Sequence, residues 1–395
     1  MRGKTLVGVA GPEVTGKAAT SGTFRPGDVL ICPALSLDHY KQAMDSAAVL
    51  CSAGGLTGHL PSICRIRGIP VVIFEPGDLA AIAVGASVTV SPATGTATVH
   101  DREQGGQPIG HAAARRDPGD FAPIEAVIAL CADIDAVNGC VASGLVDSFF
   151  IREEFLWTAL AAEKKRSALI TSPAEGAALL RAEADAMLRS LMPGQSLTFR
   201  LLDLRSDEAE VLELDVAGEG GEPNPELGLH GSRRIAQDAR YQAMIRTLRP
   251  ELRGAPIKWS IPFINDEFEL NQILGRLEVT DTRDWGVFVE TPAAVCQLPR
   301  MLDSGVSVVN VGTKDLVQFV LAADRNNRAV AHVYDTRHPA VMSALSAIVS
   351  HCTGYDVTLR IFALGADIGY YRSCLPTDTR FMLCASELIQ SFSAA

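Results

Sequence analysis

The chain of 395 residues lacks long apolar runs, blocks of like charge and closely spaced cysteine pairs. No run reaches the roughly 18 apolar residues that a membrane-spanning helix needs, so we expect no contact with a membrane. The net charge of −11 is spread along the chain, which argues against a nucleic-acid partner and against a polybasic membrane anchor. The N-terminus shows no signal-peptide pattern, and we therefore expect a cytoplasmic protein.

The nine cysteines include no Cys-x-x-Cys pair and no spacing typical of a zinc site. Most stand inside apolar runs, which indicates buried, reduced thiols. A hydrophobic content of 47% and a charged content of 21% are those of an ordinary globular protein. Because the length exceeds the usual size of one hydrophobic core, we predict two domains.

Residues 1–105 contain short β-type runs separated by glycine and proline, which predicts a small β-rich domain. A helix is expected to start near Gly58 or His59. It should stop before Gly68-Ile69-Pro70, because glycine and proline end helices. The clearest of the expected strands are Val29–Cys32, Ala48–Cys51, Val71–Phe74 and Ala86–Val90.

The polar residues 106–120, with several glycines and prolines, are typical of an interdomain linker. Over residues 121–395, apolar strands alternate with helical segments. Eight β/α units over about 275 residues match the size of a (β/α)8 TIM barrel, so we predict an α/β fold of that type. The expected barrel strands begin near Ala126, Val146, Leu197, Ile257, Gly286, Val306, Val357 and Arg380.

His59 follows the glycine-rich segment Gly54-Gly55-Leu56-Thr57-Gly58 and stands at the start of the expected helix. Backbone N–H groups and the helix dipole at such a position stabilise negative charge, which suits a phosphorylated imidazole. The alternative is that Thr57 caps the helix and His59 is an incidental surface residue, since short glycine motifs also arise by chance. Taken with the barrel motifs below, the segment predicts a histidine that carries a phosphoryl group.

Glu290 and Asp315 each follow a predicted barrel strand, Trp285–Val289 and Ser307–Val311. The carboxyl ends of barrel strands carry the active site in this architecture. Two carboxylates there can hold one Mg²⁺ and leave positions for water and substrate oxygens. The alternative is that both acids cap helices.

Arg200 lies in an apolar run, and Arg325 follows Asp324 directly. Planar guanidinium groups suit phosphate and carboxylate, so both arginines are candidate substrate-binding residues. The alternative for each is an ion pair with a neighbouring acid, such as Asp203 or Asp324.

Together these segments resemble the phosphoenolpyruvate-utilising family, which includes enzyme I of the sugar phosphotransferase system, phosphoenolpyruvate synthase and pyruvate phosphate dikinase. Gly54–His59 resembles the Gly-Gly-x-Thr-Ser-His segment of the family's mobile domain. Ile151–Leu156 is similar to the family's Tyr-Arg-Thr-Glu-Phe-Leu segment, and Glu290–Arg325 is the most specific part. The resemblance covers most of the chain.

The resemblance implies that His59 carries the phosphoryl group, that Glu290 and Asp315 bind Mg²⁺, and that Arg200 and Arg325 contact phosphoenolpyruvate or a related small molecule. It also implies that the N-terminal domain swivels, bringing His59 to the barrel and taking it away. A separate phosphoryl acceptor or donor protein and a homodimer are further expectations by resemblance. A chain of this length leaves no room for an ATP-grasp domain or for the helical insert by which enzyme I docks its carrier protein.

Three positions in the predicted substrate site depart from the family pattern. His230 stands where arginine is usual, and histidine, only partly charged near neutral pH, cannot make the same forked contact. Lys314 replaces an asparagine and could still donate to phosphate as a point charge. Glu208 falls where lysine is usual, which reverses a charge. His230 and Lys314 remain predicted substrate-binding residues.

Val357–Asp367 aligns with the family segment that holds the catalytic cysteine, the acid that protonates the enolate. Ile361 falls at that position, and isoleucine has no proton to give. The residues that could replace the missing acid are Cys352, Cys374, Tyr370 and Tyr371.

Three functions follow, in order of preference. The first is a phosphotransferase that moves a phosphoryl group between phosphoenolpyruvate, or a close analogue, and His59, then to an unknown acceptor. The second is a divergent biosynthetic enzyme that uses the metal–enolate site for different chemistry, because Ile361 replaces the acid. The third is a non-catalytic binding or regulatory protein on an inherited scaffold.

Overall fold

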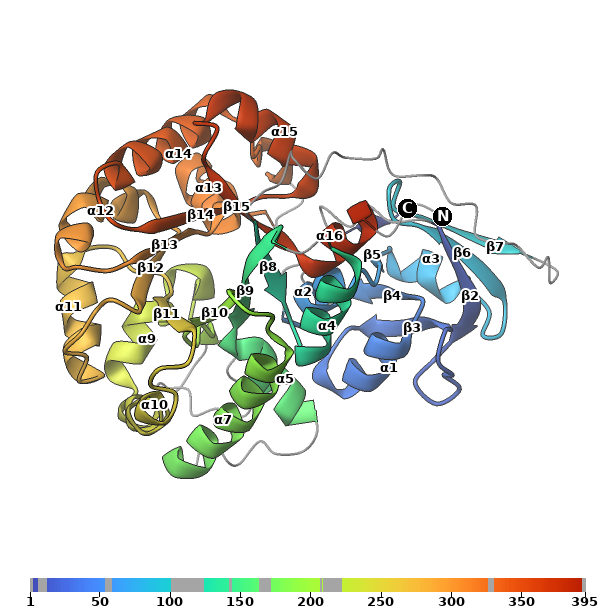
Figure 1. Cartoon of the computed structure of the whole chain (residues 1–395). Coiled ribbons are helices and arrows are strands. Elements are labelled where there is room, and N and C mark those ends of the chain that lie inside the picture. The colour runs from blue at the N-terminus through green and yellow to red at the C-terminus, as the bar shows by residue number, and fades with distance from the viewer. Residues whose placement is uncertain are drawn as a thin grey trace.

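The computed structural model describes residues 3–5, 13–53, 59–100, 124–141, 144–162, 172–206, 208, 222–325 and 330–392. The predicted linker over residues 106–120 and the segment Gly54–Gly58 lie outside these residues. Figure 1 shows a sheet built from the N-terminal part of the chain beside a barrel built from the rest. The predicted α/β architecture, a TIM-like barrel with a separate sheet domain, is therefore confirmed.

The N-terminal sheet has the strand order β1-β5-β4-β3-β2-β6-β7. Its centre is parallel, from β2 through β5, while β1, β6 and β7 pair antiparallel at the two edges. The strands are β1 (Lys4–Thr5), β2 (Val14–Ala19), β3 (Val29–Ala34), β4 (Ala48–Ala53), β5 (Val71–Ile73), β6 (Ser87–Ser91) and β7 (Thr96–His100). The short helices are η1 (Leu37–His39), α1 (Tyr40–Asp45), α2 (His59–Ile66) and α3 (Pro76–Ala80).

The barrel is closed by eight parallel strands in chain order, since β15 pairs with β8. Its strands read as near-continuous apolar runs because side chains on both faces are buried, as in Trp285–Val289, where all five residues are buried. They are β8 (Ile124–Ile128), β9 (Val146–Arg152), β10 (Ser196–Arg200), β11 (Ile257–Ile261), β12 (Trp285–Val289), β13 (Val308–Val311), β14 (Thr358–Phe362) and β15 (Arg380–Cys384). Six of them begin within one residue of the predicted start, and β8 and β13 begin two residues from it.

Helices surround the barrel strands and bury their apolar faces against them (Figure 1). The α-helices are α4 (Cys131–Cys140), α5 (Glu153–Ala162), α7 (Pro173–Ser190), α9 (Gly231–Gln237), α10 (Ala239–Glu251), α11 (Glu267–Arg276), α12 (Pro292–Asp303), α13 (Thr313–Leu321), α14 (Pro339–Cys352), α15 (Gly365–Cys374) and α16 (Ala385–Phe392). Two 3-10 turns, η3 (Pro225–Leu227) and η4 (Ala331–Val333), stand between them.

Helix α2 of the N-terminal part packs on the barrel, between the sheet and α16 (Figure 1). Its residues Ile63 and Ile66 are buried within the same apolar cluster as the barrel core. The Ser386 hydroxyl donates to the Arg65 carbonyl at 2.9 Å, and Arg67 pairs with Asp133 at 3.3 Å. Apolar burial and these two polar contacts hold the N-terminal sheet domain against the barrel.

All nine cysteines lie in the described residues and are free. Five of them are buried, Cys32, Cys51, Cys64, Cys352 and Cys384, which bears out the expected buried thiols for these positions. Within the part of the chain that the structure describes, no helix has the length and apolar character needed to cross a bilayer.

Candidate active site

Two adjoining pockets lie where α2 meets the carboxyl ends of the barrel strands. The first, here called the phenylalanine pocket, is walled by Phe150, Phe155, Phe288 and Phe362 and also takes Ser62, Arg65 and Ile66 from α2. The second, here called the ion-paired pocket, is lined by Asp203, Arg205, Glu208, Glu226, His230 and Arg325, among others. Ser62, Arg152, Lys314 and Asp315 line both.

Arg200, the last residue of β10, is only 2% exposed and is surrounded by acids. Its guanidinium group lies 2.5 Å from Glu154, 3.1 Å from Asp203 and 3.4 Å from Glu290. Burial would lower the pKa of Arg200, but these three carboxylates raise it above its usual range. The ion pair with Asp203 that the sequence left open therefore exists, and Arg200 also lines the phenylalanine pocket.

Glu290 follows β12 and Asp315 stands in the first turn of α13, and both line the phenylalanine pocket. Burial raises the pKa of Glu290 to about 8, with Arg200 opposing the shift and the charge of Asp315 adding to it. Burial would also raise the pKa of Asp315, but Arg325, 2.9 Å away, lowers it below its usual range. Two acids that repel each other in one pocket form a natural place for a cation.

The backbone around Glu290 is shaped to admit its carboxylate. The N–H of Phe263 donates to Glu290 at 3.0 Å, and Phe263 holds a left-handed backbone with φ of 51°. Such a conformation is strained for a residue other than glycine and gathers at functional sites. A Cβ on Gly312 would lie 2.6 Å from the Glu290 Cγ, so only glycine leaves room for this acid.

The donor set at this pocket fits a hard cation such as Mg²⁺, which prefers carboxylate, water and substrate oxygens. Glu290 and Asp315 would supply the two protein ligands. Among the described residues no group of three or more histidine, cysteine or acidic side chains could hold a metal by itself. Water and substrate oxygens would therefore have to complete the coordination.

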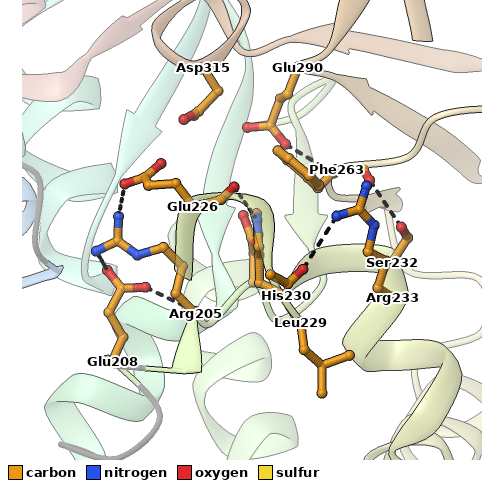
Figure 2. A network of polar contacts seen from close by, with 12 residues as sticks. Arg205, Glu208, Glu226, Leu229, His230, Ser232, Arg233, Phe263, Glu290 and Asp315 are labelled. Carbon is orange, nitrogen blue, oxygen red and sulfur yellow. Dashed lines mark hydrogen bonds and ion pairs between the residues drawn. The ribbon is translucent and has the colours of Figure 1, made fainter. Parts of the chain in front are cut away.

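His230 lies in a network of polar contacts in which both of its ring nitrogens have partners (Figure 2). Its Nδ1 lies 2.9 Å from Asp203, and its Nε2 lies 3.0 Å from the Glu226 carbonyl oxygen. Burial would lower the pKa of His230, but the bond to Asp203 and that acid's charge raise it to about 9. His230 is thus an imidazolium ion near neutral pH, rather than partly charged. Because both of its ring nitrogens already have partners, it contributes positive charge to the pocket but no unused hydrogen-bond donor.

Arg205 sits beside this network and is also neutralised by acids (Figure 2). It pairs with Glu226 and, at 2.9 Å, with Glu208. Gln318 donates to the same Glu226 carboxylate at 3.1 Å. Glu208, where the sequence showed a reversed charge, therefore serves an internal ion pair, and the ion-paired pocket is largely satisfied by the protein's own charges.

Lys314, the second residue of α13, faces both pockets and meets no carboxylate in the described chain. Its Nζ lies 5.7 Å from the centre of the Phe362 ring. Burial and then the charge of Arg65 lower the pKa of Lys314 well below its usual range. Arg325 differs from Lys314 because it forms an ion pair with Asp315 at 2.9 Å.

Helix α2 begins at His59, as predicted, and its later residues reach the phenylalanine pocket. Ser62 and Ile66 stand three and seven residues after His59. Because residues four apart share one face of a helix, Ser62 and Ile66 meet the pocket from one side of α2. The structure thus brings the helix of His59 together with Glu290, Asp315 and Arg200.

Ile361 lies in β14 and is fully buried in the apolar cluster of the barrel, while its neighbour Phe362 lines the phenylalanine pocket. Neither side chain can donate a proton. Cys384, the last residue of β15, lines the same pocket and was missed by the sequence analysis, although it stands at the end of a predicted barrel strand, where active-site residues gather. The suggested replacements Cys352, Cys374, Tyr370 and Tyr371 line neither pocket.

The fold and the site define a two-part α/β protein in which a helix of a small sheet domain closes on the acidic and basic mouth of a parallel barrel. Family models agree with both parts. The model described as the PEP-binding domain of PEP-utilising enzymes matches residues 112–366, and the one described as their mobile domain matches residues 24–95. The chain therefore belongs to the phosphoenolpyruvate-utilising enzyme family.

Curated relatives agree with this assignment. The chain is 25% identical over 366 residues to phosphoenolpyruvate synthase of Pyrococcus furiosus, a match that covers 85% of this chain and 43% of the relative. It is 26% identical to a probable phosphoenolpyruvate synthase of Archaeoglobus fulgidus, over 84% of this chain and 44% of the relative. It is 27% identical to a phosphoenolpyruvate-protein phosphotransferase of Haloferax volcanii, over 77% of this chain and 54% of the relative. The chain spans less than half the length of the two synthases.

Proposed function

We propose that this protein is a phosphotransferase that moves a phosphoryl group between phosphoenolpyruvate, or a close analogue, and His59. One observation carries the proposal: the helix that begins at His59 packs against the pocket that holds Glu290 and Asp315. In this arrangement a phosphoryl group would have a donor or acceptor on the helix and charged groups on the barrel. A separate protein or small molecule would then exchange the phosphoryl group with His59.

The chain's own residues divide the work. Glu290 and Asp315 would hold Mg²⁺, which when bound neutralises charge on phosphate and enolate oxygens. Arg200 and Arg325 fix the positions of these two acids through their ion pairs. Helix α2 and the phenylalanine side chains exclude water from the pocket, which strengthens each of these interactions.

After phosphoryl transfer from phosphoenolpyruvate, conversion of the enolate to pyruvate requires an acid, and Cys384 is our candidate. Burial raises the pKa of its thiol to about 11, so the sulfur keeps its proton at neutral pH. In the step, the S–H bond breaks, the enolate double bond supplies the electron pair for a new C–H bond at C3, and solvent returns a proton to the thiolate. Cys384→Ala should then slow pyruvate release by about 10²–10⁴-fold while His59 is still phosphorylated.

The test of the main proposal is the intact-protein mass after incubation with phosphoenolpyruvate and Mg²⁺. Wild type should gain the mass of one phosphoryl group, and His59→Ala should not. His39→Ala is the matched control, since His39 belongs to the same domain and bonds to Ser36. No gain in wild type with any divalent cation would refute the phosphotransferase.

One observation favours a second candidate, a divergent enzyme that acts on a different anion. Arg205, His230 and Arg325 are each paired with acids of the protein, so in the described part of the ion-paired pocket Lys314 is left as the basic group that meets no carboxylate and could contact a phosphate. Phosphoenolpyruvate that binds without labelling His59, together with turnover of another carboxylate substrate, would support this candidate over the first.

A further inference from the structure

Two cations of the phenylalanine pocket come from different domains and share one aromatic ring. The Arg65 Cζ lies 5.5 Å from the centre of the Phe362 ring, and the Lys314 Nζ lies 5.7 Å from it. Arg65 belongs to α2, whereas Lys314 belongs to α13 of the barrel. An aromatic ring attracts each cation but does nothing to reduce the repulsion between them.

Neither cation has an acid to balance it within the described chain. Arg65 is only 4% exposed, and its Nε and Nη2 have no hydrogen-bond partner. Leaving a buried donor unsatisfied destabilises a protein, and more so when the group is charged. By contrast, the neighbouring Arg200 and Arg152 both pair with Glu154 in the same pocket. Arg65 and Lys314 thus present two basic groups to the phenylalanine pocket with no carboxylate of the described chain paired to either.

We propose that Arg65 and Lys314 together bind one oxyanion group, a phosphoryl or a carboxylate, between α2 and the barrel, and that this anion fastens the N-terminal domain in its docked position. The proposal rests on the proposed function and deepens it, because it names two side chains that would hold the substrate in addition to Mg²⁺. Since one cation comes from each domain, the position exists only when the domains meet. Ligand binding and docking then strengthen each other.

The same helix end offers a control for simple docking. Arg67 also bridges the two domains, but it does so through Asp133, and it does not line the phenylalanine pocket. Arg67→Gln should weaken docking equally with and without ligand. Arg65→Gln should remove only the part of docking that depends on the anion.

The experiment uses the full chain with His59→Ala, so that no phosphoryl transfer interferes. Calorimetry with Mg²⁺ measures the affinity for phosphoenolpyruvate, oxalate and inorganic phosphate, and hydrogen exchange measures protection of α2 and α16. We expect Arg65→Gln and Lys314→Gln each to weaken binding about 10–100-fold, the loss of one charge-assisted hydrogen bond. The double variant should lose much less than the product of the two, since both act on one group.

The three probes separate the two sources of the oxyanion. If the group is a phosphoryl, Arg65→Gln weakens inorganic phosphate and leaves oxalate unchanged; if it is a carboxylate, the pattern reverses. Protection of α2 that rises with ligand in the Arg67→Gln protein but not in the Arg65→Gln protein supports the inference. Equal affinity of the Arg65→Gln and parent proteins for all three probes overturns it, as does the absence of binding by the parent protein.

Failure of the proposed function looks different. Binding that depends on Arg65 and Lys314, without any mass gain at His59 in the wild-type chain, would leave the inference standing and end the phosphotransferase. Phosphorylation of His59 together with binding that is unchanged by Arg65→Gln would support the phosphotransferase and overturn the inference.

Discussion

In the ion-paired pocket Arg205 and Arg325 meet carboxylates of the protein, whereas in the neighbouring phenylalanine pocket Arg65 and Lys314 meet an aromatic ring. Arg205, His230 and Arg325, which line only the first pocket, are paired without a ligand, whereas Lys314 lines both pockets. The second holds charges that lack counter-ions in the described chain. Charges that are paired within the protein fix the shape of a site, whereas charges without a partner are available to bind a ligand. We therefore distinguish the paired arginines, which shape the site, from Arg65 and Lys314, which would contact the ligand.

The largest expected effect comes from breaking the balanced side at Arg200. Arg200→Met keeps the apolar stem but leaves Glu154, Asp203 and Glu290 without their shared cation. We expect a loss of about 3–5 kcal/mol in the free energy of unfolding, because an uncompensated buried charge is costly. Urea unfolding at pH 7 measures it.

The control is Arg283→Met, which removes a surface ion pair with Asp281 from a side chain that is 86% exposed. That change should leave the stability of the protein unaltered, because solvent screens exposed pairs. A loss below about 1 kcal/mol for Arg200→Met would mean that the three acids do not depend on this arginine.

The next largest effect is the pH dependence of stability that comes from the pair of His230 with Asp203. The pKa of His230 is raised from 6.5 to about 9 in the folded protein, so its contribution to stability is complete below pH 6.5 and is lost as the pH rises through 9. Wild type should therefore lose on the order of 2–3 kcal/mol between these values. His230→Asn should flatten this slope, whereas the exposed His332→Asn should not; parallel pH profiles for wild type and His230→Asn would contradict the assignment.

Features of the fold and of the site that depend on neighbouring residues in the sequence could be predicted, and contacts between distant segments could not. The barrel strands were predictable because both of their faces are buried and their apolar runs are local, and α2 was predictable because Gly68 and Pro70 end it. Glu290 and Asp315 were predictable because they follow such strands. These features need only a short window of sequence.

Two of the ion pairs are local: Arg200 with Asp203 and Arg205 with Glu208 are each three residues apart, and the first was named from the sequence as an alternative. The rest of the charge balance was not predictable, because the other pairs join segments that are distant in the chain. Arg205 and Glu226 are 21 positions apart, and Arg65 and Lys314 lie over the same ring although they come from different domains. His230 was expected to be partly charged, but its partner Asp203, 27 residues earlier in the chain, keeps it protonated. The place of Cys384 in the phenylalanine pocket was not predicted, because it lies beside Phe362 only through the pairing of β14 with β15.

A smaller effect is expected at Gly312, which borders Glu290. A methyl group there would lie 2.4 Å from Phe288 Cε1 and 2.7 Å from the Glu290 Oε1, so Gly312→Ala forces both side chains to move. We expect a loss of about 1–3 kcal/mol, measured by urea unfolding, together with weaker Mg²⁺ binding measured by calorimetry. Gly275→Ala is the matched control: it lies in α11 with nothing within 4 Å of the added methyl, so it should stabilise the protein slightly. An unchanged Gly312→Ala protein would show that the Glu290 position is not fixed by its surroundings.

The smallest effect, and the sharpest contrast with Arg200, is expected at Lys314 in the unbalanced pocket. Lys314→Met keeps the length of the side chain and its packing on Phe362 while removing a buried amine that no acid of the described chain offsets and whose pKa is lowered by burial and by the charge of Arg65. Without ligand the free energy of unfolding should therefore stay the same or rise by up to about 1 kcal/mol, whereas Arg325→Met, which strips Asp315 of its partner, should lower it. If Lys314→Met instead destabilises the protein as much as Arg325→Met does, then Lys314 is balanced by a group outside the described residues, and the distinction between the paired arginines and the two side chains that would contact the ligand fails. If stability is kept while affinity for the oxyanion falls, the unbalanced charge exists for the ligand rather than for the fold.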